Sequence, residues 1–319
     1  MKKIFILLLA MCGCEKVVDL NITTHNPLLV VNGILDTDSI PSILISHSTG
    51  AFVQDDISCI LDADVLLYED DVLLGLMILD SSNIDTFTIT QDGWWNEINN
   101  EFISYYKFDA NPKPGSTYSI DVNHIDYESV YATTTIPNDI ELIAFDVVDH
   151  SNDTDTTVYN ATLNVTFDDA VNQRNYYRIR LFLHTEGQHW GEDNAFVNRK
   201  NYPLVLYSND PSLSQGIPWD EYTFSGRTAL FSDNLFNGDQ KEISFDIEYK
   251  LEGIEYGDSL FLQFTSFSED GYNYFNSIET NRGQFISPFG TEPVPVYSNV
   301  ENGIGIFAGG NSMYFQLLP

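Results

Sequence analysis

The sequence has few basic residues, few cysteines and no long apolar run. Only 14 residues are Lys or Arg against 47 Asp or Glu, which gives a net charge of −33. Nucleic acids and anionic lipids both attract basic surfaces, so this charge argues against either as a partner. Three cysteines are too few for a dense disulfide framework. No apolar stretch reaches the roughly 18 residues of a membrane-spanning helix.

The N-terminus does carry a short apolar run with the flanks of an export signal. Lys2 and Lys3 precede the apolar residues 4–11, and a small residue follows. A basic start, a short apolar segment and a small residue at the cut site are typical of a secretory signal peptide. We therefore predict a lipoprotein signal peptide over residues 1–13.

Cys14 is the predicted lipidation site. It follows the small residue Gly13, as the acylated cysteine of bacterial lipoproteins does, whereas Cys12 follows the larger Met11. An acylated cysteine carries at least two lipid chains, which suffice for stable anchoring without crossing the membrane. Residues 14–26 would be the lipidated cysteine and a short tether. The alternative is that an ordinary signal peptidase cuts nearby and both cysteines are incidental.

The sequence is rich in strand-forming residues set between turn formers. Hydrophobic residues make up 43% and aromatics 13%, too much for a disordered chain. Short runs of Val, Ile, Thr, Tyr and Phe alternate with Asn, Asp, Gly and Pro, which is typical of strands and turns. We predict an all-β fold of two β-sandwich-like (immunoglobulin- or fibronectin-like) domains, with at most one or two short helices in the second. The domains are expected at 27–137 and 138–319, with a long loop at about 187–228.

Alternation with a period of two identifies the individual strands, because successive side chains of a strand point to opposite faces. In residues 175–185 it places four apolar side chains on one face and Arg178 and Arg180 on the other. One segment, 268–282, has helical spacing, with Ser268 as its expected cap. The predicted strands lie in residues 27–35, 42–48, 63–70, 71–79, 115–124, 127–137, 159–169, 175–185, 241–251 and 258–268.

Several stretches in order resemble a known family. They are "CEKVVDLN", "LLVVNGILDT", "PKPGSTYSIDV", "ATTTIP", "NYYRIRLFLH", "LFSDNLFNGDQ" and "PFGTEPVPVYSNVENGIGIFAGGN". Together they resemble the Bacteroidota outer-membrane lipoprotein family known as domain-of-unknown-function family 4249, over essentially the whole mature chain.

The resemblance implies an outer-membrane lipoprotein that accompanies a TonB-dependent receptor or another outer-membrane complex, with no established enzymatic activity. It brings no catalytic residues. The rival interpretation is a stand-alone cell-surface lipoprotein that binds a glycan or a protein, and an unrecognised hydrolase is a third. Only Glu15 lies close behind the cysteine where surface export favours an acidic tract. The sequence therefore leaves both the cell-surface and the periplasmic face open.

No pattern of residues nominates a catalytic, metal or cofactor site. His184, Glu186 and His189 lack the spacing of a zinc helix, so surface histidines are favoured over a metal site in a loop. The aspartate pairs in 153–155 and 168–169 lack the glycine and the final glutamate of a calcium loop. There is no G-x-S-x-G motif, and Cys59 lies in an apolar stretch that predicts a buried structural thiol. We expect a non-enzymatic protein without metal or cofactor.

A glycine-rich stretch at 299–311 has no lysine and no following helix, so we favour glycines with a backbone role over a phosphate loop. Its glycines predict tight backbone turns. The remaining candidates for contact with a ligand or partner are Trp94 and Trp95, adjacent in "DGWWNE", and Trp190 in "GQHWGED". Exposed tryptophans suit sugars and protein interfaces. Adjacent residues of a strand point to opposite faces, however, so one of the first pair could belong to the core.

Overall fold

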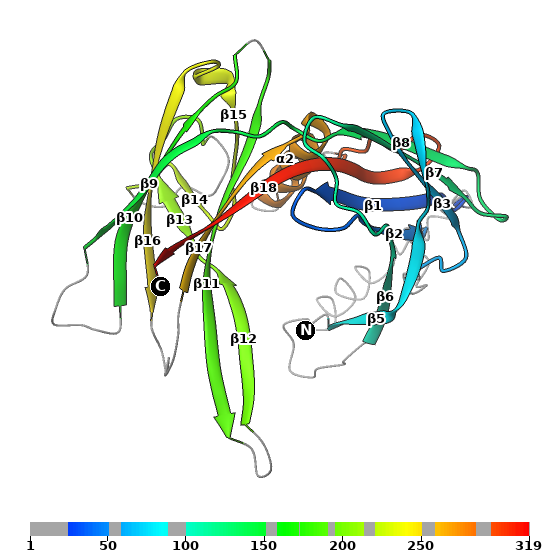
Figure 1. The fold of residues 1–319 in the computed structure, drawn as a ribbon, viewed down its shortest axis with the longest axis horizontal. Helices are drawn as coiled ribbons and strands as arrows, with labels where there is room; N and C mark the ends of the chain where they lie inside the picture. The colour runs from blue at the N-terminus through cyan, green and yellow to red at the C-terminus, as the bar shows by residue number, and fades with distance from the viewer. Residues whose placement is uncertain are drawn as a thin grey trace, which may run out of the picture.

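The protein is an all-β chain with a single α-helix in its described part, as the sequence predicts (Figure 1). The computed structural model describes residues 25–50, 59–88, 100–150, 158–171, 173–190, 195–213, 221–250, 259–284 and 295–318.

A nine-stranded central sheet runs through the molecule and combines strands from both ends of the chain. The C-terminal strand β18 (Ile304–Leu318) pairs with β1 (Leu29–Asp36) in parallel and with β17 (Ser259–Phe267) antiparallel. A further strand, β15 (Ala229–Ser232), pairs with β11 (Tyr176–Trp190) beside the main path. The order is β12 (Ala195–Pro203), β11 (Tyr176–Trp190), β17 (Ser259–Phe267), β18 (Ile304–Leu318), β1 (Leu29–Asp36), β2 (Ser42–His47), β6 (Asn100–Lys107) and β5 (Ile78–Thr88).

Two smaller sheets complete the fold, and both share a hydrophobic cluster with the central sheet. One consists of β4 (Val72–Leu76), β3 (Asp64–Glu69), β7 (Thr117–Asn123) and β8 (Val130–Thr135). The other consists of β14 (Phe224–Gly226), β13 (Leu206–Ser208), β16 (Gln240–Lys250), β10 (Val158–Asp168) and β9 (Leu142–Asp149). We call the sandwich with the four-stranded sheet the first lobe and the sandwich with the five-stranded sheet the second lobe.

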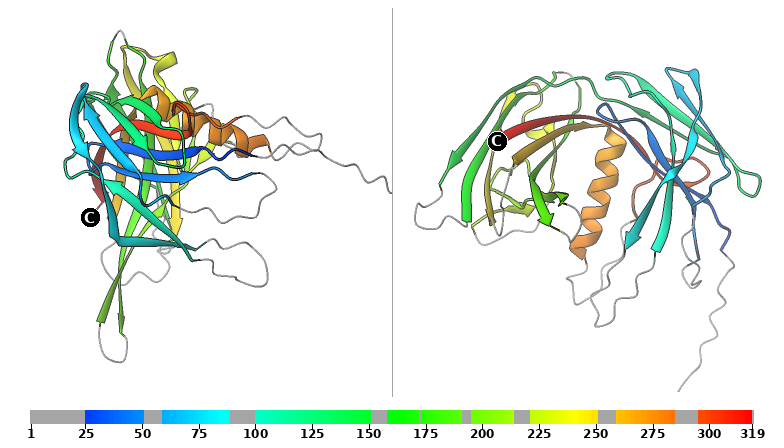
Figure 2. Two further views of the ribbon diagram at one scale, coloured as in Figure 1. Left: turned by 90° about the vertical axis from the view of Figure 1, so that its right-hand side faces the viewer. Right: turned by 60° about the horizontal axis from the view of Figure 1, so that its bottom comes forward.

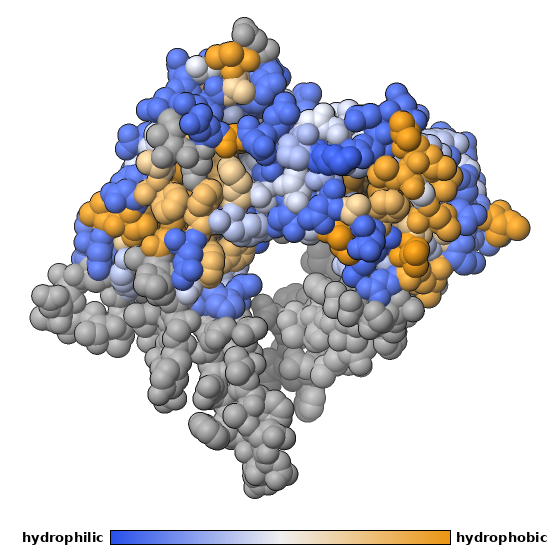
Figure 3. All heavy atoms as spheres, in the orientation of Figure 1, coloured by the Kyte–Doolittle hydropathy of each residue, from blue (hydrophilic) through white to orange (hydrophobic). Residues whose placement is uncertain are grey.

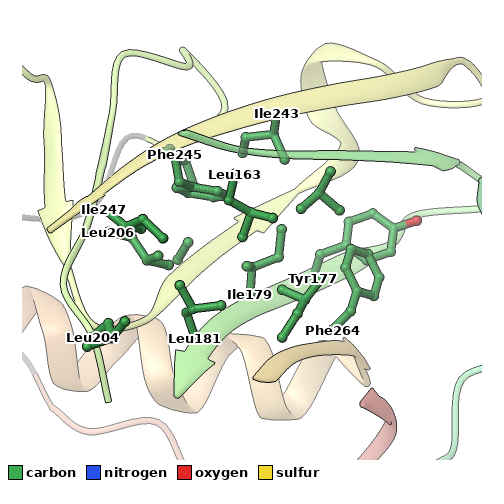
Figure 4. Packing of buried hydrophobic residues seen from close by; sticks show 14 of the residues in the cluster. Leu163, Tyr177, Ile179, Leu181, Leu204, Leu206, Ile243, Phe245, Ile247 and Phe264 are labelled. Carbon is green, nitrogen blue, oxygen red and sulfur yellow. The ribbon is translucent and has the colours of Figure 1, made fainter. Parts of the chain in front are cut away.

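The predicted alternation places the apolar side chains inside these sandwiches. In the second lobe Leu163 of β10 and Ile179 and Leu181 of β11 are fully buried and meet Phe245 and Phe264 (Figure 4). In the first lobe, β3, β7 and β8 likewise bury the apolar side chains of one face in the core. Strands β7 and β8 form the expected antiparallel hairpin. Burial of one face of each strand explains why a period of two is so clear in the sequence.

Strand β18 contributes to both hydrophobic clusters. Its Phe307 is fully buried in the first lobe, whereas Met313 and Phe315 pack against the core of the second. Val300, just before the strand, also packs in the first lobe. These C-terminal residues thus pack with strands from 29–136, although the sequence assigns the whole range 138–319 to the second domain.

The glycines of β18 lie in a strand, so the expectation of tight turns there is wrong within 305–310. Their role is close approach of backbones. A Cβ on Gly309 would lie 2.6 Å from the carbonyl oxygen of Thr135, and Gly305 has φ +118 beside Val31. Glycine inside a strand often marks such an approach.

The stretch 187–228, expected to be a long loop, contains β12, β13 and β14 and the end of β11. Strand β12 lies at the edge of the central sheet and carries polar residues and a terminal proline, which an edge strand tolerates. Strands β13 and β14 have three residues each, too few to show a period. Their sequence signal is therefore weak.

The predicted helix is α2 (Glu269–Gln284), and Ser268 caps it. The Ser268 hydroxyl accepts a hydrogen bond of 3.2 Å from the backbone N–H of Gly271. Residues Tyr272 and Phe275 of α2 pack with Ile34 of β1 and Phe267 of β17 on the face of the central sheet opposite the sandwich cores. Figure 2 shows α2 beneath the arched central sheet. We call this second face of the central sheet the open face.

Candidate functional site

The structure describes little of the predicted contact residues. Cys14, Trp94 and Trp95 lie outside the described residues. Trp190 is the last residue of β11 and pairs in register with Ala195 of β12, but its side chain lies outside the described part. These three tryptophans stay predictions.

The histidine segment forms a strand instead of the loop considered for a metal site. His184, Glu186 and His189 all lie in β11, paired with β12. The Nδ1 atom of His184 lies 2.6 Å from Oδ1 of Asn201 on β12. Among the described residues, no group of three His, Cys, Asp or Glu side chains is placed to hold a metal ion.

Two other residues considered from the sequence have structural surroundings. Cys59 is half-buried at an isolated bridge with Ser46, so it is less buried than the sequence predicts. Asp169 is buried and accepts hydrogen bonds from the hydroxyl of Tyr177 and, at 2.7 Å, from the backbone N–H of Gly238. These hydrogen bonds satisfy the buried carboxylate and connect three segments of the second lobe.

The open face of the central sheet holds the polar site that the sequence did not nominate. Arg178, Arg180 and Phe182 alternate on β11, and register places them opposite Thr265, Gln263 and Phe261 of β17. The next strand, β18, continues these rows with Ser312, Tyr314 and Gln316. A groove of about 380 Å³ lies over this part of the sheet, lined by Arg180, Phe182, His184, Asn201, Phe261, Gln263 and Tyr314.

Arg178 lies deepest, at the edge of α2. Its guanidinium carbon stands 4.5 Å from the ring centre of Phe267 and 5.7 Å from that of Phe275 on the helix. Its Nη2 donates a long hydrogen bond of 3.4 Å to Thr265. Burial lowers the pKa of Arg178 to about 10, and the nearby charge of Arg180 acts in the same direction. Two guanidinium groups thus share one poorly solvated face.

Arg180 opens onto the groove. Its guanidinium carbon lies 4.6 Å from the ring centre of Phe182, and its buried Nε has no hydrogen-bond partner. Opposite it, the side chain of Gln263 is only 5% exposed; its amide nitrogen donates a 2.7 Å hydrogen bond to the hydroxyl of Tyr314, and its oxygen has no partner. A cationic donor and a neutral acceptor therefore both stand unsatisfied in one groove.

The nearest acids act on Arg178 and Tyr314 and not on Arg180: the charges of Asp36 and Asp38 favour the charged form of Arg178, and Asp38 is hydrogen-bonded to the hydroxyl of Tyr314. Asp36 of β1 accepts hydrogen bonds of 3.0 and 2.6 Å from the backbone N–H and the hydroxyl of Ser312. Burial raises the pKa of this carboxyl above its ordinary value. Within the described part of the chain, neither Arg178 nor Arg180 forms an ion pair. Two arginines without an ion pair are unusual in a chain with 47 acidic residues.

A second exposed feature lies on the first lobe, where β4 is an edge strand of the four-stranded sheet. Leu73 in β4 is 52% exposed. Four further apolar residues, at alternate positions from β4 to the first residue of β5, are also exposed: Val72 by 65%, Leu74 by 37%, Leu76 by 51% and Ile78 by 73%. We call these four residues the β4 surface. Figure 3 shows an apolar area on this lobe. The sequence predicted the strand but gave no sign that its apolar residues stay uncovered.

A family model named DUF4249, for a domain of unknown function, matches residues 15–315. The chain belongs to this family. The match confirms that the sequence motifs identified the family, and it covers strands of both lobes. No curated protein matches this DUF4249 chain significantly. In the part of the chain that the structure describes, no helix is long and apolar enough to cross a membrane.

Proposed function

We propose that this DUF4249 protein is a lipid-anchored outer-membrane protein that binds a protein partner and catalyses no reaction, the partner being a TonB-dependent receptor or a complex built on one. The observation that carries the proposal is the exposed, apolar β4 surface. Cys14 supplies the anchor and the β4 surface supplies the contact.

The β4 surface has the chemistry of a protein interface. Contiguous exposed apolar side chains on a soluble domain mark sites of interaction. An edge strand also offers unpaired backbone groups to a further strand, which is why proteins usually protect such edges with charge or proline. Strand β4 (VLLGL) has neither. A partner that adds a strand beside β4 would pair its free backbone groups, and a partner with an apolar face would cover its exposed side chains.

Strand β9, one of the two edge strands of the five-stranded sheet, differs from β4 in its charged residues. Strand β9 exposes Phe145 by 38% and Val148 by 41%, but Asp146 and Asp149 interrupt these apolar residues. Charges of this kind discourage association of edges. Of these two edge strands, therefore, β4 is the one that lacks such protection.

The charge of the chain favours a protein over a lipid surface as the partner of β4. The turn into β4 carries Asp70 and Asp71, next to Glu69 of β3, and the whole chain has a net charge of −33. Anionic membrane surfaces repel such acidic segments. The lipid on Cys14 would hold the protein at the membrane, and the β4 surface would remain available to a neighbour.

The test of partner binding is purification of the tagged full-length protein from its native membrane in mild detergent, followed by mass spectrometry. We expect a stoichiometric outer-membrane barrel protein with the wild type and its loss with the double variant Leu74→Lys and Leu76→Lys. The control is Ile125→Lys, which adds a charge at a residue of the same lobe that is 95% exposed. A wild-type protein that purifies alone would overturn the proposal.

The anchor has its own test in the same cells. Labelled palmitate should be incorporated into the wild type and into Cys12→Ala, but not into Cys14→Ala, which should leave the membrane fraction. Label that persists in Cys14→Ala would refute anchoring through this residue. Because the two experiments address different segments, failure of one does not obscure the result of the other.

A further inference from the structure

The groove on the open face of the second lobe is built from three rows of side chains across β11, β17 and β18. The middle row is Arg180, Gln263 and Tyr314, each directly opposite the next in the strand register. Opposed residues on neighbouring strands have Cβ atoms about 4.5–5.5 Å apart, so the guanidinium and the amide reach the same small volume.

The arrangement leaves complementary chemistry unmet. Arg180 has a buried Nε without an acceptor, and Gln263 has a buried Oε1 without a donor. Leaving a buried polar atom unpaired is costly, and most buried polar atoms in native proteins are paired. The Nε atom of Arg178 is unpaired as well, so three such atoms lie on this face of the sheet. Two of them belong to Arg180 and Gln263, which oppose each other and line the groove, and this indicates a ligand that brings one acceptor and one donor.

Two lysines elsewhere in the described part of the chain are paired with acids. Lys107 contacts Asp80 at 2.8 Å, and Lys241 contacts Asp210 at 2.5 Å. Arg180 instead faces a neutral amide, with a second cation, Arg178, two residues away on the same face. An arginine placed beside another arginine and away from acids is suited to an external anion.

We propose that this groove binds a small organic carboxylate that also carries a hydroxyl or N–H group. The carboxylate meets the guanidinium of Arg180, the ligand's donor meets Oε1 of Gln263, and its apolar or ring portion lies against Phe182 and Phe261. This site is separate from the β4 surface, and the inference does not depend on the proposed protein partner.

The geometry favours an organic acid over a simple inorganic anion. The groove of about 380 Å³ lies at the small end of ordinary ligand sites, which are about 300–1,000 Å³. A bare anion buries no apolar surface against the aromatic walls, whereas a ring or methylene portion of an organic acid would do so. Arg180 offers a planar fork that fits a carboxylate with two hydrogen bonds. Arg178, held under α2, adds a positive charge from behind, which Asp36 and Asp38 offset in part.

The test uses ligand-observed NMR and calorimetry on the full-length protein in detergent. The probes are mandelate, N-acetyl-L-phenylalanine and D-glucuronate, each paired with its neutral primary amide, together with inorganic phosphate. We expect at least one carboxylate to bind at least about ten-fold more tightly than its amide, because a hydrogen-bonded charge pair contributes that much. Absence of binding by all three, equal binding of acid and amide, or phosphate binding better than the acids would overturn the proposal.

Two variants locate the site, and one serves as control. Arg180→Gln should abolish carboxylate binding, whereas Arg227→Gln, the same change at an exposed arginine, should retain it. Gln263→Glu places an acid of equal size directly opposite Arg180, so it should raise the melting temperature and also abolish binding. Undiminished binding by Gln263→Glu would show that the ligand lies elsewhere.

Discussion

Gly305 and Val31 face each other in the parallel pair of β18 and β1, and a Cβ on Gly305 would stand 1.9 Å from the Val31 carbonyl oxygen. The two backbones approach closely at the point where the C-terminal strand enters the central sheet. Gly305 also has φ +118, which side chains rarely allow. The contact belongs to β18, which packs in the cores of both lobes.

Gly305→Ala should therefore destabilise the protein severely, by about 3 kcal/mol or more, since both the backbone strain and the clash with the Val31 backbone must be relieved. Urea unfolding followed by circular dichroism measures it. The matched control is Gly75→Ala: Gly75 also has a positive φ of 153°, but its Cβ would meet only a side chain at 3.4 Å. We expect about 1–2 kcal/mol there. Equal losses at the two sites would contradict the steric argument.

Tyr177→Phe should cost about 1–3 kcal/mol, because it removes the hydroxyl that donates to the buried carboxylate of Asp169 while leaving the ring in the core. Tyr222→Phe removes a similar bond of 2.7 Å to Asp246 at a half-buried site, where water can replace it. We expect no more than about 1 kcal/mol for that variant. Chemical unfolding of both variants decides whether burial controls the difference.

Asp233 predicts a pH dependence. Burial raises the pKa of its carboxyl above the ordinary value of 3.8. In the pH window directly above 3.8, the folded state therefore holds its proton when the unfolded state has lost it, so this residue makes the free energy of unfolding fall as pH rises. Asp233→Asn should flatten that fall, and its amide oxygen can still accept from the backbone N–H of Asn175, now at 2.7 Å. A variant with the wild-type slope in urea unfolding across this window would refute the assignment.

Ser268→Ala should loosen α2 from the central sheet. The Ser268 hydroxyl accepts from the backbone N–H of Gly271 and, at 3.1 Å, from that of Gly309 on β18. Loss of a helix cap typically costs about 1 kcal/mol, and the second bond adds to this. Thr280→Ala, at an exposed helix position, is the control and should change stability little. Hydrogen exchange of α2 should rise only in the first variant.

The strands of the two sandwiches were predictable because each has one buried face. Leu163 and Val165 of β10 recur at every second position on a face that excludes water, so periodicity alone identified them. Strand β12 escaped prediction because an edge position needs no apolar face. Parallel pairing of β1 with β18 joins the two ends of the described chain, and nothing local in either strand specifies it.

The sequence predicted part of the groove, namely the shared face of its two arginines. Alternation correctly placed Arg178 and Arg180 on the face opposite the core, but it did not show that this face forms a groove. Gln263 lies on another strand, and only the register of β11 with β17 sets it opposite Arg180. A signal was available in hindsight: two arginines at alternate positions of one strand are conspicuous in a chain with only 14 basic residues.

The sharing of β18 by both hydrophobic cores has a consequence for the order of events during folding. Neither sandwich is complete until the last strand has left the ribosome and any export channel, although most strands of the first lobe come from the beginning of the chain. Such distant pairings are slow because a long loop must close before they form. The early strands must therefore wait, with their apolar faces exposed, until β18 is available to complete both cores.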